Sequence, residues 1–132
     1  MFIHAQTHDQ HAEECLRFLE AVASGQMRAR LEPMVLHELA SALPHYRKDM
    51  KRAAIADYLF GVLSWDGITG DKGVLIDTVE RWRDAPGLAF VDAFLAALAA
   101  QEDCVIYSKN ITHVTSQEAR TSDHLPHGRR QR

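Results

Sequence analysis

The sequence has no long apolar run and few cysteines, and both absences narrow the class of protein. No stretch approaches the 18 apolar residues of a membrane-spanning helix, and the first residues lack the charged and then apolar regions of a secretory leader. The two cysteines, Cys15 and Cys104, lack Cys-x-x-Cys spacing and stand beside apolar residues. We therefore expect a soluble cytoplasmic protein without a membrane partner, whose thiols are free and buried.

Strong positive charge is lacking as well. The formal net charge is −3, so the composition does not indicate a nucleic-acid binder. A mildly acidic protein can still act on RNA if its Lys and Arg side chains are confined to one rim. One basic cluster has two interpretations, a solvated helix face or such an RNA rim. It comprises Arg47, Lys48, Lys51 and Arg52.

The composition is otherwise that of an ordinary globular domain, with 46% apolar and 25% charged residues. The spacing of apolar residues predicts five amphipathic helices. Thr7 or Asp9 caps the first of them, whose buried face includes Leu16, and Val35 belongs to the buried face of the second. The first helix ends at Gly25, the second lies between Pro33 and Pro44, and the third runs from about Asp49 through Leu63. The fourth is capped by Asp71 and broken at Pro86-Gly87. The fifth has an apolar stripe of Val91, Phe94, Leu95, Leu98 and Ala99.

Short strands are expected between these helices. Residues 28–32 are one candidate, residues 65–70 contain a short strand at best, and residues 1–3 resemble the stub of another. Residues 104–107 form a continuous apolar run, which is typical of a strand covered on both faces in a parallel sheet. Strands that alternate with helices indicate an α/β fold, whose ligands gather at the carboxyl ends of the strands. Residues 115–132 lack apolar periodicity and are expected to form a disordered basic tail.

Two carboxylates stand where a solvated helix face does not predict them. Glu38 borders the apolar stripe of the second helix, and Asp92 lies near the start of the apolar fifth helix. A carboxylate beside a core is costly unless it is paired or bound to a metal. Taken singly, each has an ordinary explanation, as a helix-flank Glu or an Asp favoured by the helix dipole. Ser108-Lys109-Asn110 is likewise either a simple turn or the polar end of a central strand.

Taken together, three segments resemble conserved blocks of a known family. In this order they are Met34-Val-Leu-His-Glu38-Leu-Ala-Ser-Ala-Leu43, Phe90-Val-Asp92-Ala-Phe-Leu-Ala-Ala-Leu-Ala99 and Val105-Ile-Tyr-Ser-Lys-Asn110. They resemble PIN-domain ribonucleases, especially the toxin of VapBC toxin–antitoxin pairs. The resemblance covers residues 1–114. It implies a three-layer α/β/α domain with a small parallel sheet, in which Mg²⁺ or Mn²⁺ held by acidic residues hydrolyses RNA.

The resemblance also implies roles for individual residues. Glu38 and Asp92 would be metal ligands and catalytic residues, and Asn110 would take a metal position where many members have Asp. Asparagine offers an oxygen to a hard cation without charge. Ser108 would hold a phosphate oxygen or orient the ligands. Metal ions suit this reaction because they lower the pKa of bound water and clamp phosphate oxygens.

The family's first acidic position is missing from the sequence. Members open with a strand that ends in Asp-x-Asn, and residues 1–4 resemble the segment directly after that motif, so the first strand is truncated. A misplaced start is the favoured explanation, and a genuine truncation that impairs activity is the rival. The resemblance further implies RNA as substrate, a cognate antitoxin bound through its C-terminal segment, and a homodimer. The alternatives are a non-catalytic PIN-like remnant that acts as a protein-binding module, and a generic helical interaction domain.

The histidines offer a different interpretation. His8 and His11 stand one helical turn apart, and with His4 they could form a transition-metal cluster. No Cys/His zinc spacing accompanies them, so surface histidines are the expected explanation. His37 and His113 flank the proposed site and are candidates for RNA contact.

Overall fold

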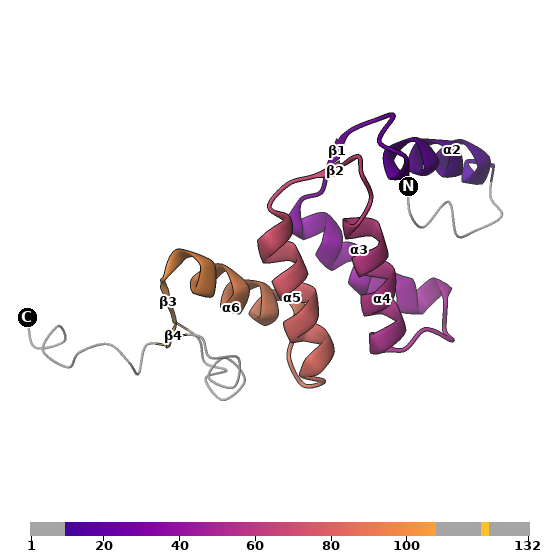
Figure 1. Cartoon of the computed structure of the whole chain (residues 1–132). Coiled ribbons are helices and arrows are strands. Elements are labelled where there is room, and N and C mark those ends of the chain that lie inside the picture. Colours follow the sequence, from indigo (N-terminus) through magenta and orange to yellow (C-terminus); the bar gives the residue numbers. More distant parts are fainter. Residues whose placement is uncertain (1–9, 108–119, 122–132) are drawn as a thin grey trace, which may run out of the picture. The chain divides into compact units, whose positions relative to one another are not determined.

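The structure is a computed structural model that describes residues 10–107 and 120–121. It divides into two compact units, Met1–Ile76 (unit 1) and Asp77–Arg132 (unit 2). The described part is mostly helical, with two short parallel strand pairs (Figure 1). Its elements are α2 (Ala12–Ala23), β1 (Ala29–Arg30), α3 (Pro33–Tyr46), α4 (Arg52–Leu63), β2 (Ile68–Thr69), α5 (Lys72–Asp84), α6 (Phe90–Glu102), β3 (Val105–Ile106) and β4 (Arg120–Thr121).

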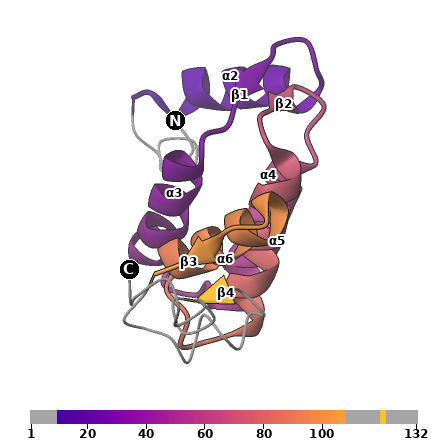
Figure 2. The ribbon, with the colours of Figure 1, turned by 90° about the vertical axis from the view of Figure 1, so that its left-hand side faces the viewer.

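In unit 1, β1 and β2 pair in parallel, as the α/β expectation requires, and α3 and α4 connect them. Ala29 lies opposite Ile68 and Arg30 opposite Thr69. Helices α3 and α4 lie side by side (Figure 2). Both strands are shorter than the candidate stretches in the sequence, but each falls inside the expected range.

The loop before β2 closes tightly on the end of α2. The N–H of Gly67 donates to the carbonyl of Val22 at 2.9 Å, and the N–H of Ala29 donates to the carbonyl of Gly67 at 2.8 Å. A Cβ at position 67 would lie 2.1 Å from the carbonyl oxygen of Met27, so only glycine fits there. We call this arrangement of residues 22–29 and 65–67 the glycine corner.

The core of unit 1 follows the expected periodicity except at Leu16, Val35 and Ala53, which are exposed. Helix α3 buries Leu36, Leu39, Ala40 and Leu43, an i, i+3, i+4, i+7 series. Val35 is 43% exposed, because it lies one position off that series. Leu16, expected on the buried face of α2, is exposed for the same geometric reason, since Cys15 and Leu19 define that face.

Helix ends differ from expectation in two places. Helix α3 continues through Pro44 to Tyr46, because a proline in the last turn forfeits little of the hydrogen-bond ladder. Helix α4 begins at Arg52, not near Asp49, whose carboxylate instead accepts hydrogen bonds from Arg47. The expected cap of α5 is confirmed, since the N–H of Val74 donates to the Asp71 carboxylate at 3.4 Å.

Unit 2 packs the end of α5 and the start of α6 through aromatic side chains. The rings of Trp82 and Phe90 meet edge to face, with centroids 5.6 Å apart. Helix α6 buries a face made chiefly of alanines, namely Ala93, Ala96, Ala97 and Ala99, together with Phe90. The predicted stripe is therefore wrong at Val91 and Leu95, which are exposed.

Strand β3 differs from the predicted central strand. It pairs in parallel with β4, Val105 opposite Arg120 and Ile106 opposite Thr121, in a segment where no regular structure was expected. Only Ile106 is buried, in a small cluster with Ala96 and Ala99. Cys104 is exposed and Tyr107 is 70% exposed, so the prediction of a strand covered on both faces and of a buried Cys104 thiol is wrong.

Several expectations fall on parts of the chain that the structure leaves undescribed. They are the strand stub at residues 1–3, the caps Thr7 and Asp9, the site residues Ser108 and Asn110, and most of the predicted tail. The single domain over residues 1–114 stays a prediction. In the described part of the chain, no helix is long and apolar enough to cross a membrane.

Candidate functional site

Glu38 is presented to solvent by α3. The helix turns Leu36, Leu39 and Ala40 inward, which leaves position 38 on the exposed side. The Glu38 carboxylate has no hydrogen bond or ion pair within the described part of the chain, so its oxygens are available to a ligand. Met34, one turn earlier on the same side, is 77% exposed.

Asp92 occupies the first turn of α6, which begins at Phe90 after Ala89. Its side chain is half-buried and takes part in interactions with its surroundings. The first N–H groups of a helix have no intrahelical acceptors, and the helix dipole favours negative charge there. Asp92 is thus an acidic side chain at the positive end of the α6 dipole.

The predicted gathering of site residues stays a prediction. Glu38 belongs to unit 1 and Asp92 to unit 2, and Ser108 and Asn110 fall outside residues 10–107 and 120–121. Ser108 and Asn110 follow β3 in the chain, but β3 belongs to a two-stranded pair in the described part of the chain and is not the central strand that was predicted. Within the described residues of either unit, no three His, Cys, Asp or Glu side chains form a metal-binding group.

Other carboxylates are already engaged. Asp77 accepts a 2.9 Å hydrogen bond from Arg81, one turn later on α5. Asp84 accepts from Arg83, and that hydrogen bond lowers the pKa of Asp84 below its usual value. Asp77 and Asp84 are therefore each paired with an arginine, whereas Glu38 has no such cation in the described part of the chain.

An open apolar cleft of about 100 Å³ lies in unit 1, a feature that the sequence did not reveal. Its walls include Leu19 of α2, Arg30 of β1, Leu31 directly after β1, Val35 of α3 and Trp65. A dry cavity of roughly 150 Å³ accepts benzene, so this cleft suits one aliphatic side chain better than a nucleobase. Val35 lines this cleft, but from the sequence it was assigned to the buried face of its helix.

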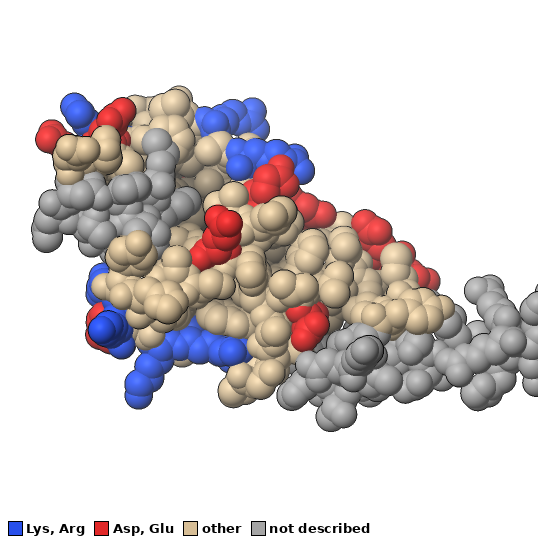
Figure 3. All heavy atoms as spheres, turned by 180° about the vertical axis from the view of Figure 1, so that it is seen from behind, with Lys and Arg blue, Asp and Glu red and all other residues tan. Residues whose placement is uncertain are grey.

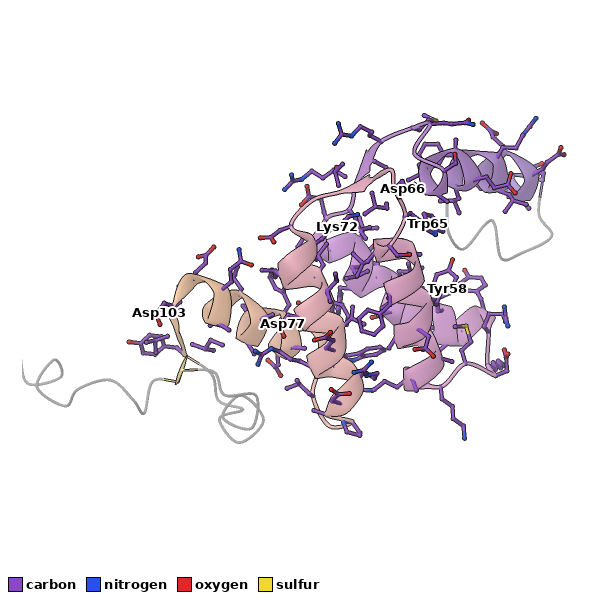
Figure 4. All side chains as sticks on the ribbon, viewed as in Figure 1. Tyr58, Trp65, Asp66, Lys72, Asp77 and Asp103 are labelled. Carbon is purple, nitrogen blue, oxygen red and sulfur yellow. The ribbon has the colours of Figure 1, made fainter. Side chains whose placement is uncertain are left out.

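Polar groups near the cleft come from the loop around β2. The Lys72 ammonium donates to the carbonyl of Trp65 at 3.3 Å, and Asp66 lies exposed beside it (Figure 4). This bond ties the start of α5 to the loop before β2. It places a cation on the loop, and Arg30 adds a charged residue to the otherwise apolar lining of the cleft.

The basic cluster is partly neutralised. Arg47 donates two hydrogen bonds of 3.2 Å to Asp49, and this pairing lowers the pKa of Asp49 below its usual value. Burial lowers the pKa of Arg52, while Lys48 and Lys51 are exposed. Figure 3 shows basic and acidic side chains set among a large uncharged surface on one face. The solvated-face interpretation of the cluster therefore gains support from the Arg47–Asp49 pair.

A scan against protein-family models finds no match, and searches of curated proteins and of solved structures find none either. The resemblance to PIN-domain ribonucleases therefore depends on the three sequence blocks alone.

Proposed function

We propose that this chain is a metal-dependent endoribonuclease, the toxin component of a toxin–antitoxin pair, with Glu38, Asp92 and Asn110 holding Mg²⁺ or Mn²⁺ against RNA. Ser108 orients the phosphate or the ligands, and an antitoxin restrains the activity. The proposal starts from the three ordered blocks that resemble PIN-domain toxins.

The observation that carries the proposal is the state of Glu38. Its carboxylate is exposed and unpartnered in the described part of the chain, on a helix whose opposite face is fully apolar. A carboxylate with free oxygens fits a hard cation, which prefers oxygen ligands. Asp92, in the first turn of α6, is a second carboxylate for the same cation.

The chemistry suits this donor set. A divalent cation supplies an activated water and charge stabilisation to phosphodiester hydrolysis. Glu38 and Asp92 contribute the negative charge that attracts the cation, whereas Asn110 contributes an oxygen alone. We therefore expect weak metal binding, with most of the cation's water shell retained.

The test is cleavage of single-stranded and structured RNA with Mg²⁺ or Mn²⁺, comparing the chain with Glu38→Gln and Asp92→Asn. Each variant should lower the rate at least about 100-fold, the upper range for groups that orient metal ligands. Asp57→Asn, which removes an exposed carboxylate from α4, is the matched control and should cleave normally. Calorimetric titration with Mn²⁺ should show weaker binding in the two site variants only.

The outcome decides between the nuclease and the binding module. Equal cleavage by the wild type, Glu38→Gln and Asp92→Asn would assign the activity to a contaminant or another site. A folded chain that binds Mn²⁺ through Glu38 and Asp92 yet leaves every RNA intact would support the non-catalytic protein-binding alternative.

A further inference from the structure

Strand β1 has one edge without a neighbouring strand in the described part of the chain. Ala29 and Leu31 donate their N–H groups toward β2, to the carbonyls of Gly67 and Thr69. Successive residues of a strand direct their peptide groups to alternate sides, so Arg30 turns its N–H and C=O away from β2. Among the residues that the structure describes, neither group has a backbone partner. Such an edge is a template for a further extended chain.

The apolar cleft of unit 1 adjoins the same strand. Ala29, Arg30 and Leu31 all line the cleft, and Leu19 and Val22 of α2 form part of its wall. The side chains of residues 29 and 31 project to one face of the strand. A chain that is added to the β1 edge also turns every second side chain to that face, so one of them can enter the cleft.

The alternate positions of the strand carry an excess of positive charge. Arg28, Arg30 and Glu32 are exposed and belong to the other row of side chains. The Arg30 guanidinium donates a hydrogen bond to the Glu32 carboxylate. Arg28 has no hydrogen bond or ion pair in the described part of the chain, so this row retains one uncompensated cation. An anionic side chain in a cross-strand position would neutralise it.

We propose that the β1 edge binds an extended, internal segment of another protein in which a glutamate stands between two aliphatic residues. The backbone of the segment pairs with the outward N–H and C=O of Arg30, as in other cases of strand addition. Its glutamate faces Arg30 and lies within diagonal reach of Arg28. One of its aliphatic side chains enters the cleft, whose volume of about 100 Å³ suits a single such group. None of these contacts requires a free chain terminus.

Two other occupants fit this edge less well. A second copy of the strand, paired about Arg30, would set two arginines opposite each other, and like charges in that position are unfavourable. RNA phosphates accept hydrogen bonds but donate none to the Arg30 carbonyl, and the cleft is too small for a nucleobase. The inference goes beyond the proposed nuclease activity, because neither Glu38 nor any residue of unit 2 belongs to this surface.

The first test compares synthetic peptides by fluorescence anisotropy. The probe is a fluorescein-labelled peptide with the central sequence Val-Glu-Val, Ser-Gly flanks and blocked ends. It reads the same in both directions, so it fits parallel and antiparallel addition alike. Because the interface is small, we expect a dissociation constant in the micromolar range. Val-Lys-Val, which reverses the charge, and Thr-Glu-Thr, which keeps the shape but not the apolar surface, should each bind about fivefold more weakly or worse.

The second test exchanges the charge on the protein. Arg28→Glu should reverse the preference, so that Val-Glu-Val binds more weakly and Val-Lys-Val more tightly than to the wild type. Arg17→Glu is the matched control, since Arg17 is an exposed arginine of α2 that does not line the cleft. This variant should bind both peptides as the wild type does.

The third test removes the outward donor. Arg30→Pro deletes the N–H that points away from β2 but leaves the donors of Ala29 and Leu31, and proline is tolerated on edge strands. It should lose Val-Glu-Val, whereas Arg30→Ala, which keeps the N–H, should bind it only several-fold more weakly. Val35→Trp fills the cleft from an exposed helix position and should also lose the peptide, which keeps the test decisive if proline disturbs the strand. Thermal unfolding of each variant checks the fold.

Four outcomes would overturn the inference. The first is a wild type that does not bind Val-Glu-Val at millimolar concentration or binds Val-Lys-Val equally well. The second is binding that survives both Arg30→Pro and Val35→Trp, because the contact then lies elsewhere. Displacement of the probe by single-stranded RNA would assign the edge to nucleic acid. Displacement by the peptide Arg-Ala-Arg-Leu-Glu, which is the sequence of residues 28–32, would assign it to a second copy.

Discussion

The two parallel strand pairs have the same length but differ in support. The β1–β2 pair belongs to the glycine corner, where backbone bonds from Gly67 fasten the end of α2 to the strand. At the β3–β4 pair, Ile106 is buried in β3, whereas Cys104 and Tyr107 on either side of that strand are exposed. The comparison teaches that a two-residue ladder depends on its surroundings, since so few strand hydrogen bonds cannot hold it alone.

The largest loss of stability is expected from Gly67→Ala in the glycine corner. The added Cβ would meet the carbonyl oxygens of Met27 and Val22 at 2.1 and 2.3 Å, and both belong to the backbone. The corner must shift and lose hydrogen bonds, so we expect a loss of about 3 kcal/mol or more in urea unfolding.

Gly61→Ala is the matched control for that variant. Gly61 lies inside α4, and a Cβ there meets nothing within 4 Å. Alanine is the better helix former, so this change should stabilise unit 1 by about 1 kcal/mol. Equal effects of the two substitutions would show that the corner is looser than its geometry indicates.

Truncating one isoleucine in each strand pair compares the two cores directly. Ile68 of β2 is packed within unit 1, whereas Ile106 of β3 contacts a cluster of small side chains, Ala96 and Ala99. Ile68→Ala should cost about 3–4 kcal/mol and Ile106→Ala about 2 kcal/mol, within the range for large-to-small core changes. Chemical denaturation measures both, and the reverse order would contradict the comparison.

A smaller effect is expected at the start of α5. Asp71→Ala removes the carboxylate that accepts from the N–H of Val74 and should cost about 1 kcal/mol. Asp71→Asn keeps an accepting oxygen and should retain most of the stability. If both variants melt at the wild-type temperature, Asp71 contributes nothing as a cap.

The smallest changes in stability are expected from two exposed ion pairs, one in each unit, and they should be equal. Hydrogen bonds from Arg47 and Arg83 lower the pKa values of Asp49 and Asp84, respectively, in the folded protein. Each carboxylate therefore stabilises the fold above the ordinary Asp pKa of about 3.9 and loses that contribution as the pH falls through its lowered pKa. Asp49→Asn and Asp84→Asn should each lower the melting temperature slightly at pH 7 and not in strong acid. Exposed pairs contribute little, so a large shift in either unit would contradict this account.

Local signals in the sequence predicted the helices of unit 1 and the Asp71 cap, because spacing and capping depend on nearby residues. The buried face of α6 was not predictable in the same way. That helix is apolar almost all round, so its sequence does not show which side faces the core. Alanines can pack closest to a neighbouring backbone, which explains why they, and not Val91 and Leu95, are buried.

The candidate site was predictable residue by residue but not as a cluster. The sequence placed Asp92 near the start of a helix, and this position is confirmed. It placed Glu38 at the edge of a buried stripe, whereas Glu38 lies on the exposed side of α3. The gathering of the two carboxylates at one site stays a prediction, because it depends on tertiary placement, which neither periodicity nor spacing encodes.

The glycine corner also has a kinetic consequence. It joins Val22 to Gly67 across α3 and α4, so its bonds close a long loop, whereas α3 and α4 meet through a short connection. The entropy of closing this long loop is lost before the hydrogen bonds of the corner can form, so the corner should fold after α3 and α4 have paired. Its bonds would then be absent from the transition state, so loosening it shortens the lifetime of the native state while the rate of refolding stays nearly constant.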